Sequence, residues 1–198
     1  KPPTKATETV TKTVHYVDEA GNPLADDAVA SVELTQLTDA VTGEKTYEPE
    51  TATLSAQANA TIHGYHVVTA STGATSDETV KFGDDDLDYT VVYAKDAPSE
   101  TTDTVTKTVH YVDEAGNKLT DNAVASVELT QLTDAVTGEK TYEPETATLG
   151  AQANATIHGY HVVTASAEAT SAQTVKFGDE DLDYTVIYAK DAPSETTD

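Results

Sequence analysis

Hydrophobic and polar residues alternate along several short segments, which is the pattern of half-buried β-strands. Within residues 10–17, Val10, Val14 and Tyr16 fall on one face, and threonines and a histidine fall on the other. The segment 89–94 carries apolar side chains on both faces, which predicts a central strand. Further strands are predicted over residues 32–37, 45–48, 62–69 and 80–82.

Turn-forming residues separate these segments. Residues 18–22 and 39–44 contain Asp, Asn and Gly, which favour tight turns. Pro49 ends the strand before it or places that strand at a sheet edge, and Gly64 predicts a bulge. Only residues 56–60 have the composition of a short helix, so we expect a mainly β fold, α+β at most.

The whole pattern occurs twice. Residues 8–102 align without a gap to residues 103–197, and 84 of the 95 aligned positions are identical. A period of this length is a domain repeat rather than a solenoid turn. Seven of the 11 differences fall within residues 23–27 and 72–78, which we interpret as loops. The predicted organisation is one repeat over residues 8–97, a linker over 98–104, a second repeat over 105–192, and linker tails over 1–7 and 193–198.

Composition narrows the classes of partner. The net charge is −24, and all 11 basic residues are lysines. A field of this sign repels nucleic acids and anionic lipid surfaces. Cysteine is absent, which excludes disulfides and zinc–thiolate sites. No apolar run is long enough to insert into a membrane. A hydrophobic content of 37% predicts a thin core in an elongated domain.

Four short motifs resemble a known family. They are the strand and turn from Thr11 to Asn22, the Asp39–Gly43 turn, the Ile62–Tyr65 element and the terminal Val91–Tyr93 strand. All four recur in the second copy, beginning at Thr106, Asp134, Ile157 and Val186. In this order and spacing they resemble the mucus-binding repeats of surface adhesins of lactic acid bacteria.

The resemblance implies a fold, a partner and a location. It implies a β-grasp, ubiquitin-like core in each of two tandem domains. The implied partner is host mucin glycoprotein or its glycans, bound by a monomeric chain within an extended repeat array. The implied location is the bacterial cell surface, with cell-wall anchoring through segments outside this chain.

One segment in each repeat has residues suited to binding a sugar. Tyr offers a flat face to a sugar ring, and His and Asn offer hydrogen bonds. Alternatively, Tyr65 packs in the core and the histidines lie on the surface. The candidate residues are His63, Tyr65, His66 and Asn59, and in the second copy His158, Tyr160, His161 and Asn154.

An acidic turn in each repeat is a candidate calcium site, and no cofactor other than calcium is expected. Calcium prefers several converging carboxylate oxygens, but the spacing lacks the alternating acids of an EF-hand. The alternative is a solvated turn that protects strand edges. The candidate ligands are Asp84, Asp85, Asp86 and Asp88, with Asp179, Glu180, Asp181 and Asp183 in the second copy.

No catalytic motif accompanies these groups, since phosphate-loop, zinc-protease and nucleophile-elbow patterns are missing from the sequence. We therefore do not expect an enzyme. Two hypotheses remain. The repeats bind mucin weakly and gain avidity from repetition, or they are a stalk that projects a distal adhesive domain.

Overall fold

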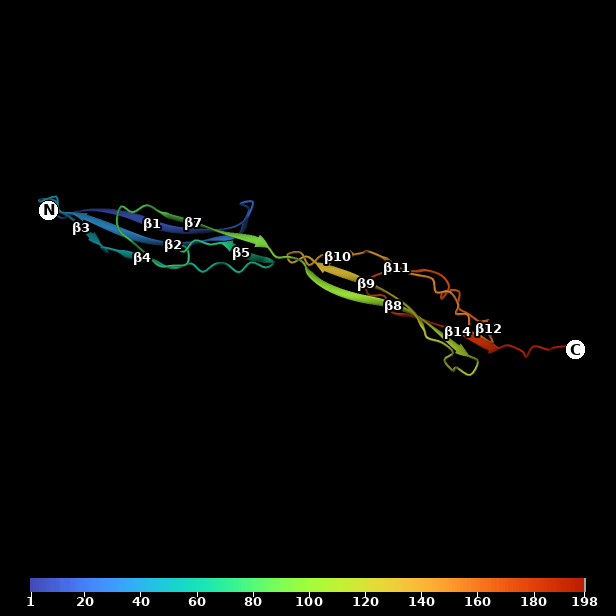
Figure 1. Cartoon of the computed structure of the whole chain (residues 1–198). Coiled ribbons are helices and arrows are strands. Elements are labelled where there is room, and N and C mark those ends of the chain that lie inside the picture. Colours follow the sequence, from blue (N-terminus) through green and yellow to red (C-terminus); the bar gives the residue numbers. More distant parts are fainter. Residues whose placement is uncertain (198) are drawn as a thin grey trace. The chain divides into compact units, whose positions relative to one another are not determined.

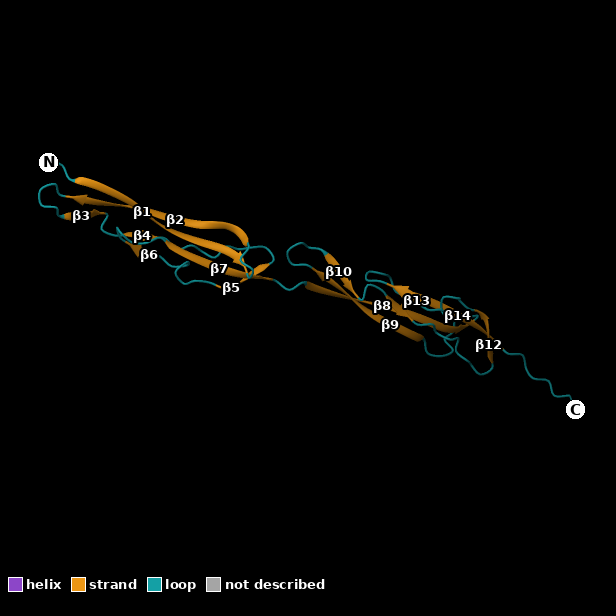
Figure 2. Cartoon of the chain, turned by 90° about the horizontal axis from the view of Figure 1, so that it is seen from above, coloured by secondary structure: helices purple, strands orange, loops and turns teal. Residues whose placement is uncertain are grey.

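A computed structural model describes residues 1–197, which form strands and loops without a helix (Figures 1 and 2). The chain divides into two compact units, Lys1–Ala97 and a second that begins at Pro98. Each unit has a five-stranded sheet and a separate two-stranded sheet. The prediction of a mainly β, two-domain chain is confirmed, whereas the β-grasp assignment stays a prediction.

The sheet of unit 1 is built around a parallel pair of strands. Its order is β3-β2-β1-β7-β5, with β1 and β7 parallel and the other pairings antiparallel. Strand β7 lies between β1 and β5, which confirms the predicted central strand. The short strands β4 and β6 pair only with each other. The bounds are β1 Thr4–Asp18, β2 Pro23–Thr38, β3 Lys45–Glu48, β4 Ala52–Leu54, β5 Tyr65–Thr69, β6 Glu78–Val80 and β7 Leu87–Lys95.

Unit 2 repeats this topology in the order β10-β9-β8-β14-β12, with β11 paired to β13. Strand β8 begins within the segment predicted as a linker, because Ser99 already pairs with Thr133 of β9. In unit 1, β1 likewise begins at Thr4, within the predicted tail. The bounds are β8 Ser99–Asp113, β9 Ala123–Thr133, β10 Lys140–Glu143, β11 Ala147–Leu149, β12 Tyr160–Thr164, β13 Gln173–Val175 and β14 Leu182–Lys190.

Each unit has two small apolar clusters on the inward face of its main sheet. The first contains tyrosines and valines of β1 and β7, and is covered by Ala74 and by the loop residues Ala60 and Ile62. The second joins β1 and β2 to the β4–β6 pair. In unit 1 the first cluster is Val14, Tyr16, Ala74, Val91 and Tyr93, and the second is Val10, Leu34, Leu54 and Val80.

The predicted helix at residues 56–60 is wrong, because this segment is an extended loop. Two buried tyrosines hold it in that conformation. The Tyr16 hydroxyl donates to the Ala58 carbonyl at 3.0 Å, and the Tyr93 hydroxyl donates to the Ala60 carbonyl at 2.6 Å. The tyrosines therefore occupy backbone acceptors that a helix would use. Burial raises the pKa of both phenols.

The predicted bulge at Gly64 is also misplaced. Gly64 adopts φ 77° in a turn just before β5, where Tyr65 N–H donates to the Ile62 carbonyl. The register shift lies further along, between Val67 and Thr69. A positive φ suits glycine in a turn as well as in a bulge, so the residue alone did not separate the two.

Both predicted turns form, and an aspartate closes each one. Asp18 accepts hydrogen bonds from Ala20 N–H and Asn22 N–H at 2.9 and 2.8 Å, and Asp39 accepts similarly from the backbone of its own turn. The bond from the Asn22 side chain, followed by backbone bonds, lowers the pKa of Asp18. Backbone bonds, led by that from Thr42, lower the pKa of Asp39.

Strand β2 of unit 1 has a continuous extension that its copy lacks. It pairs back to Pro23, whereas β9 begins at Ala123 and only an isolated bridge joins Val112 to Lys118 before it. Residues 23–27 are therefore strand in unit 1, not the predicted loop. In this extension His15 lies between two carboxylates, with Nδ1 3.0 Å from Asp27 and Nε2 2.8 Å from Asp88. A neutral imidazole has one N–H, so only the protonated ring can donate to both.

We predict that His15 makes unit 1 more stable at acidic pH. The hydrogen bond to Asp27, with the charges of Asp88 and Asp27, raises the pKa of His15. Its stabilisation is therefore fully present below about pH 6.5 and is lost as pH rises through the higher folded-state pKa. The ring is 35% exposed, so screening limits the effect to less than about 1 kcal/mol.

An NMR titration of the histidine rings checks this prediction. Asp27→Asn, which introduces the residue found at Asn122 in unit 2, should lower the His15 pKa, because the hydrogen bond to Asp27 is the main cause of its elevation. A His15 pKa that is the same in the variant and the parent chain would contradict a hydrogen bond between His15 and Asp27.

Candidate functional site

The predicted sugar-binding residues of unit 1 do not form one surface. Tyr65 is half-buried and packs against the tyrosine-containing cluster, while His66, next on β5, points to the opposite face. His66 Nδ1 lies 2.6 Å from Asp96 Oδ1. His63 is exposed at the turn, and Asn59 is half-buried in the extended loop. Tyr160, His161, His158 and Asn154 have the corresponding burial in unit 2. A shared role in sugar binding stays a prediction.

The acidic turn directs its carboxylates to different parts of unit 1. Asp84 accepts from the Lys81 N–H, Asp86 accepts from the Thr11 N–H, and Asp88 contacts His15. Asp179, Asp181 and Asp183 do the same in unit 2, with Lys176, Thr106 and His110. Within residues 1–197, no three His, Asp or Glu side chains gather into a group that could hold a metal. Asp85 and Glu180 are exposed, and calcium binding stays a prediction.

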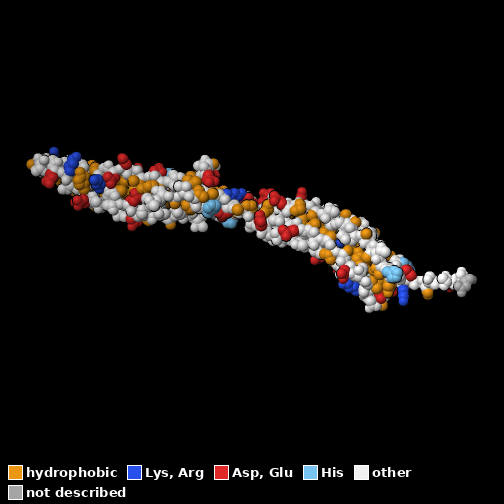
Figure 3. Space-filling model, in the orientation of Figure 1, with side chains coloured by type: hydrophobic (Ala, Val, Ile, Leu, Met, Phe, Trp, Pro, Cys, Tyr) orange, Lys and Arg blue, Asp and Glu red, His pale blue; other side chains and the backbone are white. Residues whose placement is uncertain are grey.

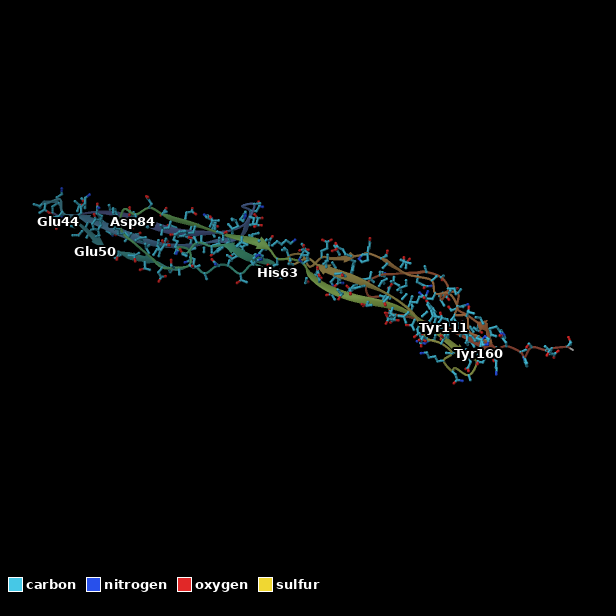
Figure 4. The ribbon with its side chains drawn as sticks, viewed as in Figure 1. Glu44, Glu50, His63, Asp84, Tyr111 and Tyr160 are labelled. Carbon is cyan, nitrogen blue, oxygen red and sulfur yellow. The ribbon has the colours of Figure 1, made fainter. Side chains whose placement is uncertain are left out.

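A pocket that the sequence analysis missed lies at the β3 end of unit 1. We call it the aromatic pocket; it encloses about 340 Å³ and is lined by Tyr47, Glu50, Thr51, Lys81 and Phe82. The rings of Tyr47 and Phe82 are tilted by 40°, with centroids 5.8 Å apart. Figure 4 shows Glu50 near this end of the unit and His63 near the other.

Two separate segments of the chain form the aromatic pocket. Tyr47 lies on the edge strand β3, opposite Gln36 of β2, whose side-chain amide donates to the Tyr47 hydroxyl at 3.3 Å. The turn that follows begins with a cis peptide bond before Pro49. Phe82 follows β6 and packs its ring against the second apolar cluster. The Tyr47 side chain remains 39% exposed, so a ligand can reach its ring.

Unit 2 has the same aromatic pocket, with a volume of about 380 Å³ and rings 5.7 Å apart at 41°. None of the 11 positions that differ between the copies lines it. Its residues are Tyr142, Glu145, Thr146, Lys176 and Phe177.

A second unpredicted feature is a fully buried lysine in each unit. Lys12 lies on the inward face of β1 between Val10 and Val14, and its side chain is 0% exposed. Its ammonium donates to the Ser76 carbonyl at 2.7 Å and lies 3.3 Å from Glu78 Oε1. The Tyr89 hydroxyl donates to the other oxygen of Glu78 at 2.6 Å, which raises the Tyr89 pKa. Burial inside the unit makes Lys12 a structural group rather than a ligand contact.

Comparison with known proteins assigns the chain to a protein family. The sequence model of the family described as Muc B2-like domain matches residues 1–97 and again residues 96–192. The chain belongs to this family. The resemblance to mucus-binding repeats drawn from the motifs is therefore confirmed. No curated protein sequence matches the chain.

Several solved structures are similar to the two Muc B2-like repeats. Mub-RV is 22% identical, over 92% of this chain and 100% of that one, with a TM-score of 0.44. The type 2 repeat of the mucus binding protein MUB from Lactobacillus reuteri is also 22% identical over the same shares, with a TM-score of 0.39. The mucin-binding domain of Spr1345 from Streptococcus pneumoniae is 27% identical, over 48% of this chain and 96% of that one, with a TM-score of 0.39.

The second Muc B2-like repeat holds its buried lysine without a carboxylate. Gln173 replaces Glu78, and the Lys107 ammonium instead donates to the carbonyls of Gly150, Glu168 and Ser171 at 3.2, 2.9 and 2.7 Å. Burial lowers the pKa of Lys107. The two repeats therefore compensate the charge of the buried ammonium with different partners, a carboxylate and a carbonyl in the first and three carbonyls in the second.

The loop around the lysine changes together with the acid. A Cβ on Gly73 would approach the Tyr89 ring to 2.6 Å, yet the aligned residue in the second repeat is Glu168. The loop and ring cannot be arranged there as in the first repeat. Instead the Glu168 carbonyl accepts both from Lys107 and from the Gln173 amide, the latter at 2.6 Å.

We predict opposite effects when the acid is exchanged between repeats. Glu78→Gln should lower the unfolding free energy of the first repeat by about 1–3 kcal/mol, because the buried ammonium loses a charged partner. Gln173→Glu should stabilise the second repeat, because Lys107 is already desolvated and would gain a carboxylate.

Native-state amide hydrogen exchange on the whole chain reports the two repeats separately and serves as the measurement. In each variant the unaltered repeat is the internal control. Finding the first repeat unchanged by Glu78→Gln and the second destabilised by Gln173→Glu would show that desolvating the carboxylate outweighs its attraction to the ammonium.

Proposed function

We propose that these tandem repeats attach a bacterial surface to host mucus through weak, multivalent binding to mucin glycoproteins. The observation that carries the proposal is the presence of two Muc B2-like repeats in one chain. In this proposal the chain is monomeric, extracellular and anchored to the cell wall through other segments, and it has no catalytic role. No helix among the described residues is long and apolar enough to cross a membrane.

A stalk is the second candidate function, and the strand lengths favour it. Strands β1 and β8 each run for 15 residues, which corresponds to about 50 Å at roughly 3.3 Å per residue. Strands of this length give each repeat reach, and near-identical copies would serve as well for spacing as for binding.

Retention on immobilised mucin separates the two functions. The whole chain should be retained, and fragment 1–97 should be retained more weakly by more than a factor of two, because the second contact of the whole chain is effectively intramolecular. Each unit has its own apolar clusters, so the fragment keeps its core. Failure of both proteins to be retained would favour the stalk.

We also predict that retention strengthens as the pH falls from 7 towards about 4–5. Acidic side chains are spread over the visible face of the molecule (Figure 3), and the net charge of −24 opposes approach to anionic mucin. Protonation of about half of the Asp and Glu side chains near pH 4 reduces this repulsion. Added salt at pH 7 should act in the same direction.

The fold should persist over this pH range. Asp18 and Asp39 have lowered pKa values in the folded state, so their stabilisation is present above the unfolded value of 3.8 and is lost only as pH falls below it. Circular dichroism at each pH provides the control. Retention that weakens steadily from pH 7 to pH 4 with the fold intact would contradict the electrostatic account.

A further inference from the structure

The aromatic pocket is a cavity to which neither the sequence motifs nor the family description gives a role. We propose that in each repeat it binds one uncharged pyranose ring of a glycan. The inference rests on the proposed function, because it names the part of the repeat that would contact a mucin glycan.

The floor of the pocket suits the apolar face of a sugar. Tyr47 and Phe82 meet at 40° with centroids 5.8 Å apart, so together they form a shallow, angled aromatic surface. The Phe82 ring is fixed from behind by the second apolar cluster, and Tyr47 is held by the Gln36 amide. The surface is therefore formed before a ligand arrives, which limits the entropy lost on binding.

The rim of the pocket supplies the polar contacts that a sugar needs. Glu50 offers carboxylate oxygens as acceptors, Lys81 offers an ammonium donor, and Thr51 offers a hydroxyl that can do either. A small number of polar groups around an apolar floor is the usual composition of a small-molecule site. One lysine and one glutamate leave the rim without net charge, so an uncharged sugar meets no repulsion from the rim.

The size of the pocket limits the ligand. A volume of 340 Å³ in the first repeat and 380 Å³ in the second lies at the small end of the range of about 300–1,000 Å³ for ligand sites. Such a cavity accommodates one ring rather than a branched glycan. With so few ligand atoms, we expect a dissociation constant on the order of 1 mM for each site.

An NMR titration of the whole chain tests the site. The probes are methyl β-D-galactopyranoside and N-acetyl-D-glucosamine, with glucuronic acid as the charged probe. At least one neutral sugar should shift the amide signals of Tyr47 and Phe82 and of their copies Tyr142 and Phe177, with equal affinity in the two repeats. No shift at these residues with either neutral sugar at about 50 mM, or tighter binding of glucuronic acid, would overturn the proposal.

Variants locate the binding. Tyr47→Ala combined with Tyr142→Ala removes the exposed half of each aromatic surface and should abolish the sugar-induced shifts. Lys81→Gln combined with Lys176→Gln alters only exposed rim residues and should weaken binding by about tenfold, as expected for loss of a charged hydrogen bond. This second pair keeps the test informative if the tyrosine variant unfolds. Val68→Ala combined with Val163→Ala, at exposed positions of β5 and β12 outside the pocket, is the matched control and should bind as the parent chain does.

Mucin retention of the same variants separates this inference from the proposed function. Loss of retention in the tyrosine variant, with normal circular dichroism, supports the pocket as the contact. If that folded variant is retained like the parent chain, the pocket is not the contact, although the adhesive function stands. If the parent chain is not retained at all, the proposed function fails, and the sugar titration then decides the pocket alone.

Discussion

The buried lysine is the constraint around which each repeat is organised. Lys12 of β1 and Lys107 of β8 lie on the inward face of the middle strand of each main sheet, between two valines, and divide the core into two clusters. A charge removed from water costs several kcal/mol unless hydrogen bonds and opposite charge compensate it. Here the segments that cover the main sheet supply this compensation. The Ser76 carbonyl, and in the copy the Glu168 and Ser171 carbonyls, point inward from the loop that precedes β6 or β13, and Glu78 of β6 adds a carboxylate in the first repeat.

This constraint explains where the two copies differ. Changes at positions 72, 73, 77 and 78 fall in or next to the segment that supplies the partners of Lys12, and those at 23, 25 and 27 lie at the end of the hairpin where Asp27 contacts His15. Both windows thus alter the partners of one cationic side chain, Glu78 becoming Gln173 and Asp27 becoming Asn122. Tolerance of change in loops does not account for this, because residues 23–27 are strand in the first repeat. The copies share a fold and differ in the electrostatics that stabilise it.

The sequence pattern predicted the features that depend on residues close together in the chain. It missed the features that depend on contacts between distant segments and on the orientation of side chains. The inward face of β1 followed from period-two alternation, the central place of β7 followed from apolar residues on both of its faces, and the turns followed from Asp, Asn and Gly. The same alternation places Lys12 on the inward face, but its charge favours solvent, and no local pattern foresees the carbonyls that a distant loop brings to it. Strand β4 is three residues long and carries no periodic signal, and the strand predicted at 80–82 overlaps the equally short β6, Glu78–Val80, only at Val80. Acid density at residues 84–88 could not reveal that the carboxylates diverge. The aromatic pocket brings Tyr47 and Glu50 together with Phe82, which follows β4, β5 and β6 in the sequence. No local sequence pattern connects residues so far apart.

The strength of a single site determines what repetition can achieve. The gain from a second contact is set by the ratio of its effective concentration to the dissociation constant of one site. For a millimolar site and a flexible connection, both quantities are of the order of 1 mM, so two repeats gain a few-fold rather than a thousand-fold. The connection here is short, because β7 ends at Lys95 and β8 begins at Ser99. Under the proposed function, such a chain would depend on dense ligand, such as closely spaced glycans, to raise the effective concentration, and on low affinity at each pocket to let attachments exchange.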